Sequence, residues 1–161
     1  MTKLAISARG DREIAISRSF NASAARIFDA FTKPAFLKRW LFGPEGWTMI
    51  VCDVDAKTGG AYRYVWRNGH GYEMGMGGIF LELKPPGRIV STERFDQAWY
   101  PGECTGTVEL VEKDGKTTMN QTLRYESREA RDIVLRSPME SGLTLGYERL
   151  ASLVFLPPPP R

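Results

Sequence analysis

The stretch from Ser137 to Phe155 places the strongest constraint on how this chain can fold. Its apolar residues recur at helical spacing and fall within an arc of roughly 120° on a helix that turns about 100° per residue. They are Met139, Leu143, Gly146, Leu150, Leu153 and Val154. A helix with one such face must bury it, so the rest of the chain has to provide a large apolar surface.

Both ends of this helix are marked in the sequence. Ser137, Pro138 and Glu140 form an S-x-x-E pattern with proline at the first helical position, which is typical of a helix start. The prolines at 157–160 end the helix, because proline removes a backbone donor and its ring clashes with the preceding turn. We therefore expect a helix of about 18 residues, followed by a proline tail at 157–161.

Most of the chain before this helix shows the alternation of β-strands, interrupted by turn signals. We expect strands at 13–20, 47–56, 61–67, 72–83, 88–95, 105–112 and 117–125, and short helices at 24–31, 34–40 and 128–136. Consecutive strands joined by short turns pair as antiparallel neighbours. This order predicts an α+β fold in which a curved antiparallel sheet wraps around the long C-terminal helix, with two short helices after the first strand.

Size and composition fit a single domain over residues 1–161, with 1–11 as a flexible lead-in. Apolar residues make up 42% and charged residues 25%, as in ordinary globular proteins. The net charge of +3 is dispersed, so we expect no nucleic-acid partner.

The sequence has no apolar run of about 18 residues and no signal-peptide core, which predicts a cytoplasmic protein with no membrane partner. Cys52 and Cys104 are too few for a disulfide scaffold, and we expect reduced, partly buried thiols.

Motifs that would indicate nucleotide or metal chemistry are missing. The glycines from Gly69 to Gly78 form no G-x-G-x-x-G or Walker pattern, and we interpret them as bulges and bends in a strand. His70 is the only histidine, so no zinc or iron site can be assembled, and we expect no metal and no cofactor. Asp53 and Asp55 share one strand face, which is typical of the solvent side of a half-buried strand.

Aromatic and methionine side chains are more numerous than a small core obviously needs. In the strand at 61–67, Tyr62, Tyr64 and Trp66 share one face and Arg63 and Arg67 share the other. One interpretation is core and rim packing, and the other is the wall of an apolar cavity. For the cavity, the candidate ligand-binding residues are Phe28, Trp40, Trp47, Tyr64, Trp66, Met74, Gln121, Met139 and Leu143.

Gln121 is the polar member of this set. It shares a strand face with Met119, Leu123 and Tyr125, so its amide should point inward. A buried amide needs a hydrogen-bond partner. A ligand, a water molecule or a neighbouring side chain would each satisfy it.

The order of several segments resembles the START-like (SRPBCC) superfamily, in the branch named after the Aha-type activator of the ninety-kilodalton heat-shock chaperone's ATPase. Residues 28–47 read FDAFTKPAFLKRWLFGPEGW. Further matches are Asp55-x-x-x-Gly59-Gly60-x-Tyr62-Arg63, Gly78-Ile79-Phe80-x-Glu82-Leu83-x-Pro85-Pro86, Thr92-Glu93-Arg94-Phe95, Ser127-x-Glu129-Ala130-Arg131-Asp132, Met139-Glu140-x-Gly142 and Leu150-Ala151-x-Leu153. The resemblance implies a helix-grip fold with a cavity between sheet and helix, in which relatives hold hydrophobic small molecules.

Three functions are consistent with these observations. The first is binding of a hydrophobic small molecule, aromatic in character, without catalysis. The second is a cyclase- or aromatase-like enzyme acting on a polyketide-like substrate, with Tyr64, Glu73 and Gln121 as candidates for proton transfer. The third is a protein-interaction role, with a chaperone or with a second copy of this chain as a homodimer. Chaperone activators of this branch depend on a separate amino-terminal domain, for which we expect the residues before 13 to leave no room.

Overall fold

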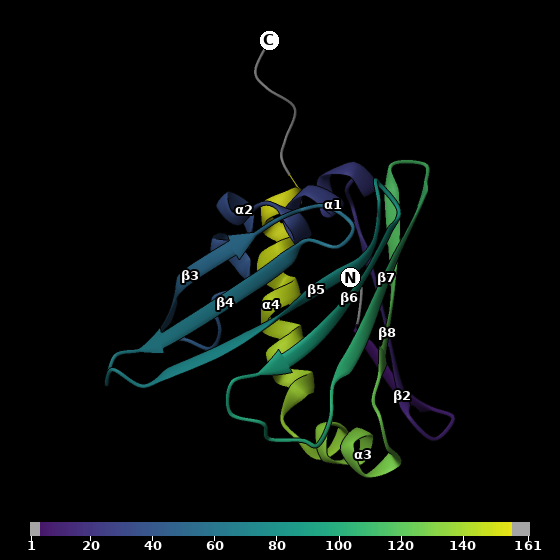
Figure 1. The fold of residues 1–161 in the computed structure, drawn as a ribbon. Helices are drawn as coiled ribbons and strands as arrows, with labels where there is room; N and C mark the ends of the chain where they lie inside the picture. The colour runs from purple at the N-terminus through teal and green to yellow at the C-terminus, as the bar shows by residue number, and fades with distance from the viewer. Residues whose placement is uncertain (1–3, 156–161) are drawn as a thin grey trace.

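An eight-stranded antiparallel sheet curves around a C-terminal helix in the computed structural model, which describes residues 4–155 (Figure 1). The strands are β1 Ala5–Arg9, β2 Glu13–Phe20, β3 Trp47–Val54, β4 Ala61–Asn68, β5 Glu73–Lys84, β6 Arg88–Phe95, β7 Cys104–Lys113 and β8 Lys116–Arg124. The helices are α1 Ala24–Thr32, α2 Pro34–Trp40, α3 Arg128–Arg136 and α4 Met139–Val154. This is the predicted α+β helix-grip fold. The proline tail predicted at 157–161 lies outside the described residues.

The spatial order of the strands is β1-β2-β8-β7-β6-β5-β4-β3. From β4 to β8 every strand pairs with its predecessor in the sequence, as the short turns predict. Strand β2 pairs with β1 and also with β8, and so brings the start of the chain beside its last strand. The sheet therefore wraps one side of α4, while α1 and α2 lie at the upper end of the helix in Figure 1.

The lead-in predicted to be flexible contains a strand. Residues 5–9 form β1, which pairs with β2 from Ala5 opposite Ser17 to Arg9 opposite Glu13. The turn between the two strands uses Gly10 at a φ of 57°, a conformation that glycine adopts without strain. The strand is short and largely exposed, so it has no alternation of buried and exposed residues from which the sequence would reveal it.

Serine hydroxyls cap α1 and α3, but the helix start predicted at Ser137 is wrong. The hydroxyls of Ser23 and Ser127 accept hydrogen bonds from the backbone N–H groups of Arg26 and Ala130, at 3.3 and 3.1 Å between oxygen and nitrogen. Ser137 does not cap the long helix. Its hydroxyl instead donates to the carbonyl oxygen of Val134 and closes the end of α3, so α4 begins two residues later and has 16 residues.

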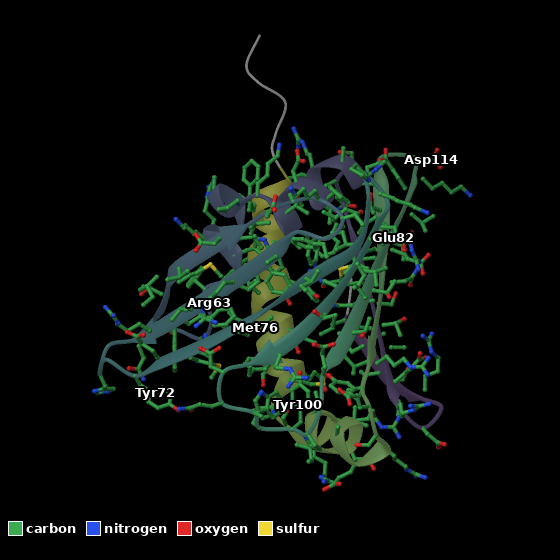
Figure 2. The ribbon with its side chains drawn as sticks, in the orientation of Figure 1. Arg63, Tyr72, Met76, Glu82, Tyr100 and Asp114 are labelled. Carbon is green, nitrogen blue, oxygen red and sulfur yellow. The ribbon has the colours of Figure 1, made fainter. Side chains whose placement is uncertain are left out.

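The two faces of the sheet differ in polarity. On the outer face, the Arg63 guanidinium donates to both carboxylate oxygens of Asp96, with Nη1–Oδ1 and Nη2–Oδ2 distances of 2.9 and 2.7 Å (Figure 2). Arg88 pairs with Glu82 at an Nε–Oε2 distance of 3.0 Å. The inner face is mostly apolar and packs against α4, as the alternation in the sequence predicts.

Two irregularities adjust the shape of the sheet. The pairing of β3 with β4 shifts between Met49 and Val51, and this bulge leaves Ile50 40% exposed instead of on the face of Cys52. In β5, a Cβ atom at Gly78 would overlap the backbone carbonyl oxygen of Thr92. The glycines of this strand therefore allow close approach of neighbouring groups, whereas β4 pairs with Gly75 to Gly78 without the predicted bulge.

Candidate functional site

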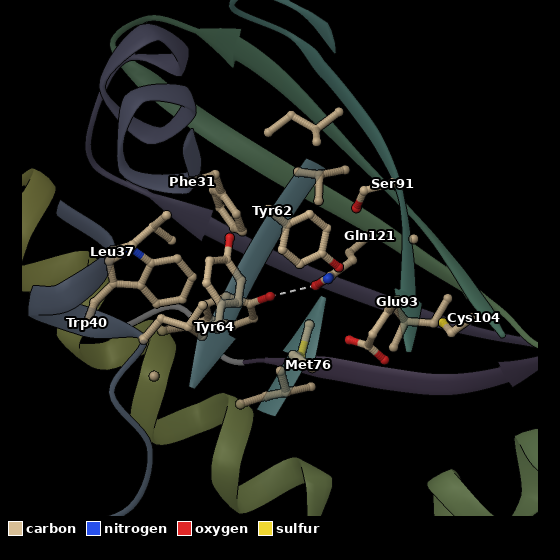
Figure 3. A pocket seen from close by; sticks show the side chains of 18 of the residues that line it. Phe31, Leu37, Trp40, Tyr62, Tyr64, Met76, Ser91, Glu93, Cys104 and Gln121 are labelled. Atoms are coloured by element: carbon tan, nitrogen blue, oxygen red, sulfur yellow. Dashed lines mark hydrogen bonds between the residues drawn. The ribbon is translucent and has the colours of Figure 1, made fainter. Parts of the chain in front are cut away.

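A cavity of about 250 Å³ lies between the inner face of the sheet and helices α2 and α4. Figure 3 shows its side chains converging from the sheet and from the helices. Much of its wall is aromatic, from Phe31, Trp40, Tyr62, Tyr64, Trp66 and Phe80. Its polar side chains are Ser91, Glu93, Gln121 and Tyr147. An apolar hollow with a few polar groups is the usual composition of a small-molecule site.

Strand β4 provides an aromatic row along one wall. Tyr62, Tyr64 and Trp66 alternate along the strand and therefore project from the same face. Neighbouring ring centroids are 4.9 Å apart for the two tyrosines and 5.9 Å apart for Tyr64 and Trp66. Phe80 of β5 extends the row, 5.4 Å from Tyr62. Rings at these distances stabilise one another, so the wall has a defined shape.

The two tryptophans of the cavity have their polar atoms bonded to the backbone. Trp40 donates from Nε1 to the carbonyl oxygen of Ala30 at 2.8 Å, and Trp66 donates from Nε1 to that of Leu41 at 2.7 Å. With the indole N–H groups satisfied in this way, both side chains offer only carbon surface to a ligand. They therefore act as apolar walls.

Gln121 points into the cavity, as predicted, and its partner is a side chain. The hydroxyl of Tyr147 on α4 donates to Oε1 of Gln121 on β8, with an O–O distance of 2.5 Å (Figure 3). Burial raises the pKa of Tyr147, and this hydrogen bond opposes the rise. Tyr147 was not part of the predicted apolar stripe of the helix, although it lies four residues after Leu143 on the same face.

Glu93 is a cavity residue that the sequence patterns did not predict. It lies on β6, on the face shared by Ile89 and Ser91, and its carboxylate points into the cavity (Figure 3). Oε2 accepts a hydrogen bond from the hydroxyl of Tyr100 at 2.9 Å. Burial raises the pKa of Glu93, and the bond from Tyr100 partly opposes this. The alternation of Ile89, Ser91 and Glu93 in the sequence would have placed this carboxylate inside.

One family model matches most of the chain. The pattern described as Activator of Hsp90 ATPase homolog 1-like protein matches residues 21–154. The chain belongs to this family. The comparison with curated proteins gave no match.

Solved structures of similar proteins have the same fold. A Rhodobacter sphaeroides protein is 30% identical, with a TM-score of 0.87 over 94% of this chain and 97% of its own. A Chromobacterium violaceum protein is also 30% identical, with a TM-score of 0.77 over 91% of this chain and 99% of its own. A Plasmodium falciparum protein described as an Hsp90 activator is 20% identical, covers 91% of this chain and 98% of its own, and has a TM-score of 0.65.

Within this family fold, five of the nine predicted ligand-binding residues come together. Trp40, Tyr64, Trp66, Gln121 and Leu143 all line the cavity. The other four lie elsewhere, and their positions follow from the geometry of the fold.

Phe28 is buried in the core between α1 and the sheet, and Met139 packs at the start of α4. Trp47 contacts Tyr72 at the beginning of β3, with ring centroids 6.2 Å apart. Met74 pairs with Trp66 across β4 and β5 but is 42% exposed. The hairpin of β4 and β5 extends past the helices (Figure 1).

The three residues proposed for catalysis do not converge. Tyr64 and Gln121 line the cavity, whereas Glu73 forms an ion pair with Arg67 near the tip of the hairpin of β4 and β5. His70 is exposed in the turn of that hairpin, as predicted. Within residues 4–155, no group of three His, Cys, Asp or Glu side chains is placed to hold a metal ion. The same described part of the chain has no helix that is long and apolar enough to cross a membrane.

The raised pKa of Glu93 predicts that folding stability falls as the pH increases above the ordinary value of 4.5. Between that value and the raised pKa, the folded protein keeps a proton that the unfolded chain releases. The free energy of unfolding therefore decreases with pH in this window, by at most about 1.4 kcal/mol per pH unit. Urea denaturation at several pH values, for the wild type and Glu93→Gln, measures the effect.

The difference in stability between the wild type and Glu93→Gln isolates this residue from the other carboxylates. We expect the free energy of unfolding of the wild type, minus that of Glu93→Gln, to decrease as the pH rises from 4.5 towards the raised pKa of Glu93. Glu109→Gln removes an exposed carboxylate that pairs with Arg88, so it should leave the pH slope of the wild type in place. A Glu93→Gln variant with the wild-type slope would contradict the assignment.

Proposed function

We propose that the protein binds a small hydrophobic molecule, aromatic in character, in the cavity between the sheet and α4. The single observation that carries this proposal is the aromatic cavity itself. Its volume of about 250 Å³ exceeds that of an engineered apolar cavity of about 150 Å³ that holds benzene. It lies just below the range of roughly 300–1,000 Å³ typical of pockets for drug-sized ligands. A ligand with one or two rings matches this space.

The chemistry of the wall supports the same class of ligand. The indole N–H groups of Trp40 and Trp66 are bonded to the backbone, and Gln121 and Tyr147 are bonded to each other. The two indole N–H groups, the hydroxyl hydrogen of Tyr147 and Oε1 of Gln121 are therefore already bonded within the protein. Burial of apolar ligand surface supplies about 25 cal/mol per Å², which favours compounds with a hydrocarbon body.

Filling the cavity from α4 tests the proposal. A Cβ atom added to Gly146 would have the Trp40 ring at 3.9 Å as its nearest contact, so Gly146→Leu should fit and project into the cavity. We expect this variant to lose binding of toluene by at least about tenfold, measured by ligand-observed NMR, with no loss of thermal stability.

The matched control for this experiment is Thr144→Leu. Thr144 is exposed on the same helix, so the substitution adds the same side chain outside the cavity and should leave toluene binding unchanged. Toluene binding that persists in Gly146→Leu would exclude this cavity as the site. Native mass spectrometry of protein purified from its own host would identify a ligand that remains bound.

A second candidate function is contact with an Hsp90-type chaperone. The match to the Activator of Hsp90 ATPase homolog 1-like family favours it, and one relative of the same fold is described as an Hsp90 activator. The direct test is the ATPase rate of purified Hsp90 from the same host, with and without this protein. An unchanged rate, together with no detectable complex in sedimentation, would exclude it.

A further inference from the structure

We propose that the ligand of the cavity is an organic amine with an aromatic or short hydrocarbon body, whose ammonium group pairs with Glu93. This inference rests on the proposed function and specifies its chemistry. The carboxylate is the one acidic group among the side chains that line the cavity. It lies deep between β6 and the aromatic row of β4 and β5, where a bound molecule would meet it.

The hydrogen bonding of Glu93 leaves one of its oxygens available to a ligand. Oε2 accepts from Tyr100, and no bond to Oε1 is formed by a side chain of residues 4–155. Every fully buried side-chain oxygen or nitrogen of that part of the chain has a partner, so Oε1 must be accessible. Since Glu93 lines the cavity, the accessible side of its carboxylate is the cavity side (Figure 3).

The described part of the chain supplies no cation for this carboxylate. Across residues 4–155, no Lys, Arg or His nitrogen lies within 4.0 Å of Glu93, although twelve other ion pairs form there. Glu93 is only partly exposed, and a carboxylate that is partly shielded from water and has no counter-ion loses part of its solvation without compensation. A ligand with an ammonium group would compensate for that loss by supplying both the opposite charge and N–H donors.

The side chains that interact with Glu93 are three tyrosines and one cysteine. Tyr62 faces it from β4, Tyr100 from the loop before β7, Cys104 from β7, and Tyr125 from the end of β8. Each of these side chains is neutral at physiological pH, since the ordinary pKa of tyrosine or cysteine lies above 7 and burial raises it further. None of them competes with a ligand cation for the carboxylate.

The aromatic wall gives a second, independent reason to expect a cation. The faces of Trp, Tyr and Phe rings attract organic cations, by about 0.5 kcal/mol when exposed and about 2 kcal/mol when desolvated. Six aromatic residues line this cavity besides Tyr147. A carboxylate set among aromatic rings is complementary to an amine and repels a carboxylate ligand such as a fatty acid.

The test uses three compounds of similar shape: 2-phenylethylamine, 2-phenylethanol and 3-phenylpropanoate. We expect the wild type to bind the amine about 10- to 100-fold more tightly than the alcohol, and to show no measurable binding of the carboxylate. Isothermal titration calorimetry in buffers of different ionisation enthalpy should also show proton release from Glu93 when the amine binds.

Glu93→Gln should reduce affinity for the amine by at least about tenfold and change affinity for the alcohol by less than about threefold. Glu109→Gln is the matched control, since it makes the same change on the outer surface and should retain the preference. Tyr100→Phe keeps the carboxylate and should also retain it. Thermal melting confirms that each variant is folded.

The inference is overturned if the wild type binds amine and alcohol equally, or if Glu93→Gln keeps the preference for the amine. The proposed function survives either result when toluene still binds the wild type and not Gly146→Leu. If toluene and all three phenyl compounds fail to bind the wild type, the inference and the proposed function both fall.

Discussion

Trp40→Ala is expected to destabilise the protein by about 3–5 kcal/mol, the usual cost of removing a large buried aromatic side chain. Trp40 is 3% exposed. It packs edge-on against Phe31 and lies beside Tyr147, with ring centroids 5.1 and 5.9 Å apart. The substitution also deprives the carbonyl oxygen of Ala30 of its indole donor, which adds the cost of an unpaired buried acceptor. Urea denaturation with a two-state fit measures this effect.

Trp99→Ala is the natural control for this experiment. Trp99 lies in the loop between β6 and β7 and is 43% exposed. Its removal should therefore cost about 1 kcal/mol or less. Equal losses for the two variants would show that Trp40 is not the central contact between α2 and α4 that the structure describes.

Trp66→Ala is expected to enlarge the cavity and to shift its preference towards larger ligands. Trp66 is only partly buried, so the loss of stability should be about 3 kcal/mol or less. The deleted indole forms the end of the aromatic row on β4, and the space it leaves is continuous with the cavity. Naphthalene should therefore gain affinity relative to toluene.

The control here is Trp47→Ala, which removes an indole that lies outside the cavity. That variant should keep the wild-type ratio of naphthalene to toluene affinity. Intrinsic fluorescence gives a second measurement, because Trp40 and Trp66 both line the site. A wild-type emission spectrum that responds to no apolar aromatic compound would count against the cavity as a binding site.

Local sequence patterns were sufficient to predict most of the fold. The alternation in the strands and the serine caps depend on neighbouring residues, so β2, α2, β6 and α3 begin and end where the sequence predicts. The failures occur where local signals are weak or compete. The strand β1 has no alternation, and Ser137 bonds back to α3 although it could equally cap α4.

The site was harder to predict because it depends on contacts between distant strands. Tyr64 and Trp66 could be identified from the aromatic alternation of a single strand. Met74 shares their face, yet it is exposed because the hairpin extends beyond the helices. Glu93 enters the sequence analysis only as part of a family motif, and its separation from the cations of residues 4–155 depends on the register of β6 with its neighbours.

Within residues 4–155 the sheet does not close into a barrel, and this leaves two free edges, at β1 and β3. A long, flat edge offers unpaired backbone groups to other chains and promotes fibrillar association. Here β1 has only five residues, and β3 is interrupted by its bulge and presents the charge of Asp53. An open sheet with short or interrupted edge strands keeps its cavity accessible and offers few unpaired backbone groups to other chains. Access to the cavity and resistance to aggregation therefore arise from the same architecture.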